Sequence, residues 1–314
     1  MEKVVLAQKT DEAAMDLLRP HCEIVFCKEG DVEDLKRALR DATAVVLGTW
    51  VKFTKELIDA APRLKVISRT GAGVDNVDIE YATEKGILVL NTPNENRVSV
   101  AEHAVAMICA LSKYLAFLDS KVRRGEFAAR RMYLPVDMEG KTLGLIGCGG
   151  IAREVAKKCI SAFGMQVIGY DPFLRSDPAG IKLQPSIEDV FRQADYLSIH
   201  TPYTQGTKDL VGARLLSLMK PSAFLINTAR GGVVNEDALY DALESRRIAG
   251  AALDVFREEP LPEGSKLALL DNILLTPHTA ALTKECSRRV VICAVTGIID
   301  YLQGKEPRFV YNKG

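Results

Sequence analysis

The stretch Leu143-Gly-Leu-Ile-Gly147-Cys-Gly149-Gly150-Ile151-Ala152 decides the fold. Its first four residues predict a buried strand and the apolar positions from Ile151 onward predict a helix, so the glycines fall at a strand-to-helix turn. Gly147 permits the tight turn, Gly149 lets a ligand approach the backbone, and Ala152 is small enough for close packing of helix on strand. The pattern predicts a dinucleotide pyrophosphate at the helix N-terminus, with a glycine-rich turn that binds nothing as the alternative.

Apolar runs and helical stretches alternate on both sides of this loop. Runs rich in Val, Ile and Leu occupy 3–7, 44–48, 64–68 and 87–91 before it, and 167–170, 196–199, 224–227, 251–255 and 273–276 after it. The alternation predicts parallel βα units. With 143–146, the later runs predict six strands in a sheet covered on both faces.

Composition limits the classes of function. The 314 residues predict two domains or one large one. With 41 basic and 41 acidic residues the net charge is 0, so the chain as a whole carries no excess positive charge for nucleic acid or an anionic membrane, and only local basic sites stay open. No apolar stretch approaches the roughly 18 residues of a membrane span, and the N-terminus lacks a signal-peptide pattern. Seven cysteines without C-x-x-C or metal-ligand spacing suit a reducing compartment. We therefore expect a cytoplasmic protein without nucleic-acid, membrane or metal partners.

An acidic residue follows the second strand of the later set. Asp171 ends the run 167–170 and lies 22 residues beyond Gly149. A carboxylate there accepts hydrogen bonds from the adenosine ribose hydroxyls and repels a 2′-phosphate, which predicts NAD as the cofactor in preference to NADP. The alternative is a turn residue before Pro172.

Three later segments place polar side chains after apolar strands. Arg230 follows 224–227, Glu259 follows 251–255 and His278 follows 273–276. Ligands of doubly wound sheets bind outside the carboxyl ends of the strands, so all three are expected near one crevice. Arginine binds a carboxylate, histidine transfers a hydroxyl proton and an acid orients the histidine, as hydride chemistry on a hydroxy acid requires. Taken singly, they could be a capping cation, a solvated acid and a loop histidine.

Residues 97–118 predict one long helix that is apolar on nearly every side. Val98, Ala101, Ile108, Leu111 and Leu118 belong to this stretch. Such a helix must be buried, either between domains or between subunits. Turn-forming residues at 91–94 precede it, which places a domain crossing there.

Further motifs are spread along the chain: Arg69-Thr-Gly-Ala-Gly-Val-Asp-Asn-Val-Asp78, Gly86-Ile-Leu-Val-Leu-Asn-Thr-Pro-Asn94, His200-Thr-Pro202, Thr228-Ala-Arg-Gly-Gly232, Asp254-Val-Phe-Arg-Glu-Glu-Pro260 and Pro277-His278. With the glycine loop, they resemble the D-isomer-specific 2-hydroxyacid dehydrogenase family over nearly the whole chain. The resemblance implies an α/β fold of two Rossmann-like or flavodoxin-like doubly wound parallel-sheet domains, with the active site in the cleft between them. Residues 1–96 and 284–314 would bind substrate, and 97–283 would bind NAD.

The same resemblance implies roles for individual residues. Arg230, Glu259 and His278 become the catalytic set, with His278 as the proton donor in reduction. The cofactor would be held by Gly147, Gly149, Gly150, Ile151, Asp171, Thr201, Thr228 and Asp254. The substrate would be held by Arg69, Arg230 and His278 and by the backbone N–H groups of Gly73 and Val74. Family members are usually dimers, which implies a homodimer through residues 97–118.

The resemblance leaves the substrate open. The motifs are most similar to those of family members that oxidise 3-phosphoglycerate, which tend to carry an arginine where this chain has Gly48. Arg69 remains, and Lys52, Arg130 and Arg131 could substitute. Reduction of hydroxypyruvate or glyoxylate, or oxidation of another anionic 2-hydroxy acid, is the alternative within enzymes. An NAD-sensing binding protein, like the co-repressor relatives of this fold, is the alternative from another class.

Overall fold

The computed structural model describes residues 1–8, 10–178 and 180–313. The chain forms two compact units: Met1–Asn96 together with Leu282–Gly314, called unit 1, and Arg97–Ala281, called unit 2. The chain returns to unit 1 at Leu282, two residues before the predicted boundary at residue 284. Thr283 belongs with unit 1 because its hydroxyl caps the last helix by accepting a hydrogen bond from the Cys286 N–H, at 3.1 Å.

Unit 1 is built on a five-stranded parallel sheet in the order β2-β1-β3-β4-β5. The strands are β1 (Lys3–Leu6), β2 (Glu23–Phe26), β3 (Ala44–Leu47), β4 (Val66–Arg69) and β5 (Leu88–Leu90). This is a flavodoxin-like order, in which the strand sequence reverses between β1 and β3. The central strand β3 is fully buried, as its continuous apolar sequence predicts.

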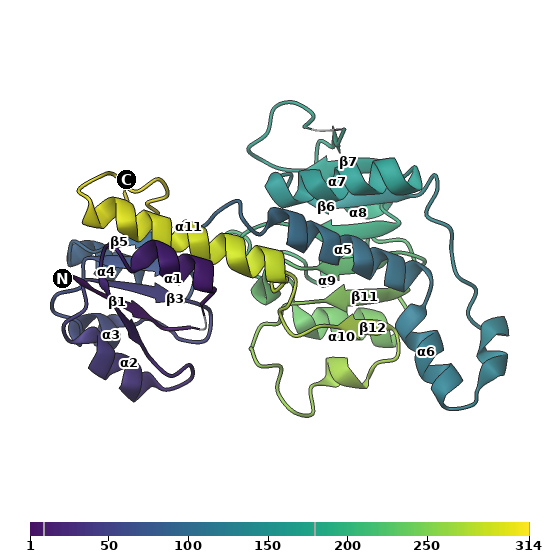
Figure 1. The fold of residues 1–314 in the computed structure, drawn as a ribbon. Helices are drawn as coiled ribbons and strands as arrows, with labels where there is room; N and C mark the ends of the chain where they lie inside the picture. Colours follow the sequence, from purple (N-terminus) through teal and green to yellow (C-terminus); the bar gives the residue numbers. More distant parts are fainter. Residues whose placement is uncertain (9, 179, 314) are drawn as a thin grey trace. The chain divides into compact units, whose positions relative to one another are not determined.

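The described residues of unit 1 form the helices α1 (Glu12–Leu18), α2 (Val32–Leu39), α3 (Lys55–Asp59), α4 (Ile79–Glu84) and α11 (Lys284–Leu302). Helix α11 packs against β4 and α1 (Figure 1). Its backbone is tied to the sheet, because the Ser68 hydroxyl of β4 donates a hydrogen bond to the Ala294 carbonyl at 3.0 Å. The last helix of the chain therefore completes the first sheet.

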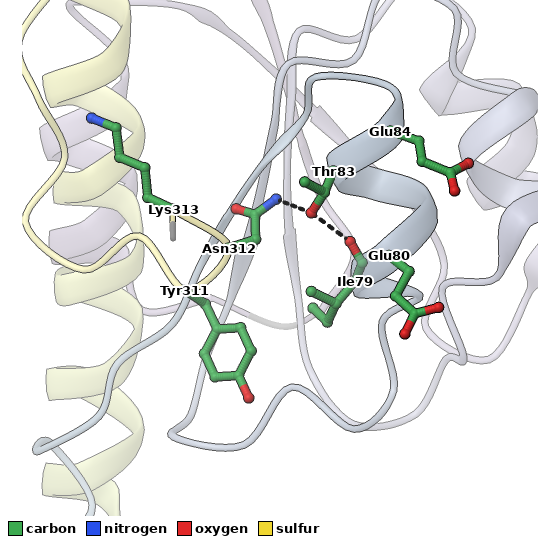
Figure 2. A pocket seen from close by; sticks show the side chains of 7 residues that line it. All are labelled: Ile79, Glu80, Thr83, Glu84, Tyr311, Asn312 and Lys313. Carbon is green, nitrogen blue, oxygen red and sulfur yellow. Dashed lines mark hydrogen bonds between the residues drawn. The ribbon is translucent and has the colours of Figure 1, made fainter.

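The segment after α11 runs beside the edge strand β5. Leu90 and Val310 form an antiparallel bridge, and the Asn312 side chain accepts from the Val89 N–H and donates to Thr83 and to the Ile87 carbonyl, at 2.8 to 2.9 Å. Figure 2 shows Asn312 directed at helix α4, beside an open hollow of about 430 Å³. None of the side chains that line this hollow is a predicted site residue. The segment protects an exposed strand edge.

Unit 2 is built on a seven-stranded parallel sheet in the order β12-β11-β10-β9-β6-β7-β8. The strands are β6 (Thr142–Ile146), β7 (Gln166–Tyr170), β8 (Lys182–Leu183), β9 (Tyr196–Ile199), β10 (Phe224–Asn227), β11 (Gly250–Leu253) and β12 (Ile273–Leu275). The order is that of a Rossmann fold, with its reversal between β6 and β9. Six strands were expected. The additional strand β8 has only two residues, and its exposed Lys182 breaks the apolar pattern.

The sheet of unit 2 is covered on both faces, as expected. Alternate residues of its strands belong to two separate hydrophobic cores, such as Leu145 to one and Ile146 to the other. The helices are α5 (Arg97–Ser112), α6 (Leu115–Arg123), α7 (Gly150–Phe163), α8 (Ile187–Gln193), α9 (Ala213–Leu216) and α10 (Glu236–Glu244), with 3₁₀ turns at η1 (Phe127–Arg131), η2 (Gly231–Val233) and η3 (Lys266–Leu269). Helices α5 and α7 contact each other, while α8 packs against β6 and β7 (Figure 1).

The prediction of one continuous helix over 97–118 was wrong. The helix breaks at Tyr114, whose φ of 51° is left-handed, and α6 leaves α5 at 57°. The Tyr114 ring contacts the rings of Tyr133 and Phe224, so tertiary packing overrides the helical pattern. Helix α5 is buried against α7, β10 and β11, but no residue of α6 is buried.

No single described helix is long and apolar enough to cross a membrane. Helices α5 and α6 meet the criteria of length and composition only when they are counted together across their bend.

Candidate active site

The glycine loop lies at the carboxyl end of β6 and begins α7. Gly147 has a φ of +84°, and its N–H donates to the Tyr170 carbonyl of β7 at 2.9 Å. Gly149 precedes the first residue of α7, and no atom would contact a Cβ placed on it. Gly150 and Ile151 begin the helix, where backbone N–H groups have no partner within the helix. The open space over Gly149 fits the close approach of a pyrophosphate.

We predict that Gly147→Ala weakens NADH binding by more than tenfold. A Cβ at 147 would lie 2.7 Å from the His200 carbonyl oxygen, and the left-handed backbone adds about 1–2 kcal/mol of strain. Both effects displace the loop that approaches the pyrophosphate. Fluorescence titration with NADH measures the change, and Gly206→Ala, where the nearest atom lies at 3.8 Å, is the control. Equal dissociation constants for Gly147→Ala and the wild type would contradict the prediction.

Asp171 holds the glycine loop from the end of β7. One carboxylate oxygen accepts from the Cys148 N–H and the other from the Phe173 N–H, both at 3.0 Å. Asp171 thus stabilises both the turn that follows it and the glycine loop, and each of its oxygens retains a lone pair for a ribose hydroxyl. Burial, together with the charge of Asp171, raises the pKa of Cys148 to about 12, so this thiol stays protonated.

Two threonines follow β9 and β10 with buried hydroxyl groups. No described group hydrogen-bonds the Oγ1 of Thr201 or of Thr228. The Cγ2 of Thr201 would lie 3.1 Å from a Cβ on Gly147, which places Thr201 beside the glycine loop. Buried polar atoms are nearly always paired in native proteins, so these hydroxyls fit contacts to a bound cofactor. Burial lowers the pKa of the neighbouring His200 to about 4, and its Nε2 lies 2.9 Å from the Ser198 hydroxyl.

The structure brings His278 and Glu259 into direct contact. His278 Nδ1 lies 2.7 Å from Glu259 Oε2, and the other Glu259 oxygen accepts from the Phe256 N–H at 3.0 Å. With Nδ1 donating to the carboxylate, Nε2 is the nitrogen that can exchange a proton with a substrate. Each side chain is 37% exposed, so both are accessible.

Arg230 belongs to the same site. The charge of its guanidinium helps to lower the pKa of the Glu259 carboxyl. Its backbone carbonyl accepts from Asn227, and one guanidinium nitrogen donates to the Ala229 carbonyl at 2.7 Å. The next residue, Gly231, has no room for a side chain, because a Cβ would lie 1.9 Å from the Phe256 carbonyl carbon. This close approach joins the Arg230 loop to the loop that carries Glu259.

The electrostatics of the site favour an ionised Glu259. Burial raises the pKa of this carboxyl, but hydrogen bonds from His278 and from the Phe256 N–H, with the charges of His278 and Arg230, outweigh burial. The net pKa lies below the ordinary value for glutamate. The carboxylate therefore persists above that lowered pKa and is lost only as the pH falls through it.

Asp254 is fully buried and holds the loop that carries His278. Its side chain accepts from the Thr279 and Ala280 N–H groups at 2.9 Å and from the Thr276 hydroxyl at 2.5 Å. The sequence analysis gave Asp254 only a role in holding the cofactor and did not single out Thr276. It left His103 without a role, yet His103 Nε2 lies 3.0 Å from Thr276 Oγ1. No spacing in the sequence links helix α5 to this loop.

The predicted substrate residues Arg69, Gly73 and Val74 belong to unit 1, at the carboxyl end of β4 and the loop after it. The Arg69 guanidinium donates to the Thr70 carbonyl at 2.9 Å and lies over Gly71. No described group accepts from the backbone N–H of Gly73 or Val74. These donors suit a carboxylate.

Gly48 follows the neighbouring strand β3, and the Gln8 side chain fills the space beside it. A Cβ on Gly48 would lie 2.3 Å from Gln8 Oε1, which accepts from the Thr70 hydroxyl at 3.1 Å. The position therefore has no room for a side chain while Gln8 stays in place. Of the four basic residues considered for a substrate phosphate, Arg130 and Arg131 lie in η1 of unit 2.

Comparisons with known proteins agree with this arrangement. The family model described as D-isomer specific 2-hydroxyacid dehydrogenase, NAD binding domain, matches residues 105–280. A D-3-phosphoglycerate dehydrogenase of Methanocaldococcus jannaschii is 37% identical over 99% of this chain, and the human D-3-phosphoglycerate dehydrogenase is 36% identical over 99%. The alignments cover 60% and 58% of those two proteins, so the chain spans about three fifths of their length.

Two solved structures are similar over the whole chain. The TT0316 protein from Thermus thermophilus is 32% identical with a TM-score of 0.91, over 98% of this chain and 99% of that one. An NADPH-dependent glyoxylate/hydroxypyruvate reductase from Sinorhizobium meliloti is 28% identical with a TM-score of 0.87, over 99% of this chain and 98% of that one.

Proposed function

The chain belongs to the D-isomer-specific 2-hydroxyacid dehydrogenase family, and on that premise we propose that it catalyses the reversible, NAD-dependent oxidation of a 2-hydroxy acid to a 2-keto acid. The observation that carries the proposal is the 2.7 Å contact between His278 and Glu259, within the unit that bears the glycine loop and Arg230. An acid, a histidine and an arginine at strand ends supply proton transfer, orientation and charge stabilisation.

His278 moves the substrate proton. In oxidation its Nε2 accepts the hydroxyl proton, and in reduction it returns that proton to the carbonyl oxygen. Glu259 keeps the imidazole ring in place and stabilises the imidazolium that forms in oxidation. The pair therefore works in both directions.

Arg230 binds and polarises the substrate. A guanidinium can hold a carboxylate or carbonyl oxygen through two parallel hydrogen bonds, which orients the reacting carbon. Within unit 1, the N–H groups of Gly73 and Val74 are proposed to bind the substrate carboxylate, with Arg69 as a further cation. These assignments follow the family resemblance and the unused N–H donors.

The residues around the glycine loop fit NAD. Gly147, Gly149, Gly150 and Ile151 would hold the pyrophosphate and Asp171 the adenosine ribose, while Thr201, Thr228 and Asp254 would contact the nicotinamide side. When bound, the nicotinamide accepts or supplies the hydride. Asp171 opposes a 2′-phosphate, so NAD is preferred to NADP.

The substrate is either 3-phosphoglycerate or an unphosphorylated acid. The names of the relatives at 36–38% identity favour 3-phosphoglycerate. Gly48 favours an unphosphorylated substrate such as hydroxypyruvate or glyoxylate, because it supplies no cation where family members that oxidise 3-phosphoglycerate tend to carry an arginine.

A substrate panel tests the function. Purified protein is assayed with NADH and NADPH against phosphohydroxypyruvate, hydroxypyruvate, glyoxylate and pyruvate, and with NAD against the matching D-2-hydroxy acids. Turnover with any pair and a lower KM for NADH supports the proposal. NADH binding without turnover of any acid would overturn it and favour an NAD-sensing protein.

We predict that Glu259→Gln lowers kcat about 10- to 100-fold in both directions. Glutamine carries no negative charge to stabilise the imidazolium that forms in oxidation, and it does not orient the ring as the carboxylate does. Steady-state kinetics between pH 6 and 9, above the lowered pKa of Glu259, measure the loss. Glu258→Gln, at the exposed neighbouring acid, is the control. Wild-type kcat in Glu259→Gln would remove the support for this role.

We also propose that the protein is a cytoplasmic homodimer that uses the region of α5 and α6. The seven described cysteines are all free, which suits a reducing compartment. Apolar side chains on α6 and after it are more than half exposed, among them Leu115, Val122, Phe127 and Met132. An exposed apolar surface of this kind favours association. Sedimentation equilibrium tests it, and a monomer at micromolar concentration would contradict the dimer.

A further inference from the structure

The loop that carries His278 adopts a backbone that needs support. His278 has a φ of +53°, a conformation that costs a non-glycine residue about 1–2 kcal/mol. Such residues persist only where the surroundings hold them in place. The His278 N–H donates to the Asp254 carbonyl at 2.8 Å, and the Asp254 side chain accepts from the N–H groups of Thr279 and Ala280. The orientation of the buried Asp254 carboxylate thus fixes the backbone of the two residues that follow the catalytic histidine.

Two further groups fix that carboxylate. The Thr276 hydroxyl, at the end of β12, donates to Asp254 Oδ1 at 2.5 Å. His103, from helix α5, places Nε2 3.0 Å from Thr276 Oγ1 and 3.5 Å from Asp254 Oδ1. The His103 side chain is 24% exposed, whereas Asp254 is fully buried.

The proton positions in this chain of contacts follow from donor counting. A threonine hydroxyl has one proton and a carboxylate has none. Because Thr276 uses its proton toward Asp254, its contact with His103 requires the histidine to donate. His103 must therefore carry a proton on Nε2, and the bonds run in one direction from His103 through Thr276 to Asp254.

We propose that His103 is a positioning residue for His278, acting through Thr276 and Asp254. The proposal deepens the proposed function and rests on it, since the proton transfer that is positioned is that of the 2-hydroxy acid. The hydrogen bond from the Thr276 hydroxyl to Asp254 Oδ1 keeps the carboxylate from rotating. If the carboxylate rotated, it would lose its hydrogen bonds from the Thr279 and Ala280 N–H groups. His278 would then lose its alignment with the substrate, where a misplacement of about 1 Å can cost about a hundredfold in rate.

The tautomer of His103 is tested first, on the wild-type holoenzyme. Long-range ¹H–¹⁵N correlation of the imidazole rings, with His103→Leu for assignment, reports which nitrogen carries the proton. We expect a protonated, pyrrole-type Nε2 for His103 at neutral pH. A pyridine-type, unprotonated Nε2 would overturn the proposal, whatever the catalytic results.

Paired variants test the effect on catalysis. Thr276→Val keeps the shape and removes the hydroxyl, and Thr276→Ser keeps the hydroxyl. We expect kcat of reduction to fall 10- to 100-fold in Thr276→Val and to stay within about threefold in Thr276→Ser, with the dissociation constant for NADH within about threefold in both. His103→Leu should lose kcat like Thr276→Val, and His103→Gln, which retains an N–H donor, should recover most of it.

A double variant separates positioning from general destabilisation. If His103 acts through Thr276, then His103→Leu combined with Thr276→Val loses no more kcat than Thr276→Val alone. Multiplicative losses, or a KM for the keto acid that rises while kcat stays unchanged, would contradict the proposal. If the wild type reduces no keto acid, the proposed function fails instead, and the tautomer measurement still decides the inference about His103.

Discussion

Replacing His278 by asparagine should lower kcat about a hundredfold or more in both directions while NADH still binds. Asparagine keeps a polar side chain near Glu259 but cannot exchange a proton at neutral pH, and general acid–base catalysis is typically worth 10²- to 10⁴-fold. The loop should survive the change, because the bonds from Thr279 and Ala280 to Asp254 do not involve the imidazole. Stopped-flow single turnovers with NADH measure the chemical step directly.

The matched control for this variant is His21→Asn. His21 lies after α1 in unit 1 and has no assigned role in the reaction. Its activity should equal that of the wild type. Retention of wild-type kcat in His278→Asn would remove the proton-transfer role and, with it, the main support for the proposed reaction.

Replacing Arg230 by alanine should lower kcat/KM by about 10²- to 10³-fold, with effects on both KM and kcat. The guanidinium binds the substrate in the ground state and stabilises the charge on its oxygen in the transition state, so its loss affects both constants. Arg230→Lys keeps the charge without the paired donors and should recover only part of the loss. Steady-state kinetics with the preferred keto acid measure these effects.

Arg214→Ala is the control for the loss of a cation from unit 2. The Arg214 side chain is 71% exposed and pairs with Glu188 at the surface, an interaction that contributes little to stability. A change in KM alone for Arg230→Ala would show that this arginine binds the substrate without stabilising the transition state.

The sequence allowed the strands, the glycine loop and the fold class to be predicted, because their signals are local. Strands β9 and β10 lie at the predicted residues, and the other buried strands differ from the predictions by one or two residues at one or both ends. The break at Tyr114 was not predictable, because its cause is contact with rings at 133 and 224. Strands β2 and β8 were missed, because β8 carries no apolar run and β2 has no fully buried residue.

The candidate site was predicted from Arg230, Glu259 and His278, which each follow a strand. The structure places His278 Nδ1 2.7 Å from Glu259 Oε2, and the catalytic roles of the three residues stay predictions. The line from His103 to Asp254 was not found, because it joins residues about 150 positions apart on a helix and a strand end. The substrate stayed open because the motifs favour 3-phosphoglycerate, whereas Gly48 lacks the arginine that such family members tend to carry.

The placement of α11 in unit 1 has a consequence for synthesis on the ribosome. The nascent chain completes all five strands of the first sheet before Arg97 is added, yet the helix that packs on β4 is made only after the whole of unit 2. At about 5–20 residues per second, that delay lasts roughly 10–40 s. During this interval the face of β4 that α11 later covers is exposed to solvent and to chaperones. Unit 2 can therefore complete its fold before unit 1 does.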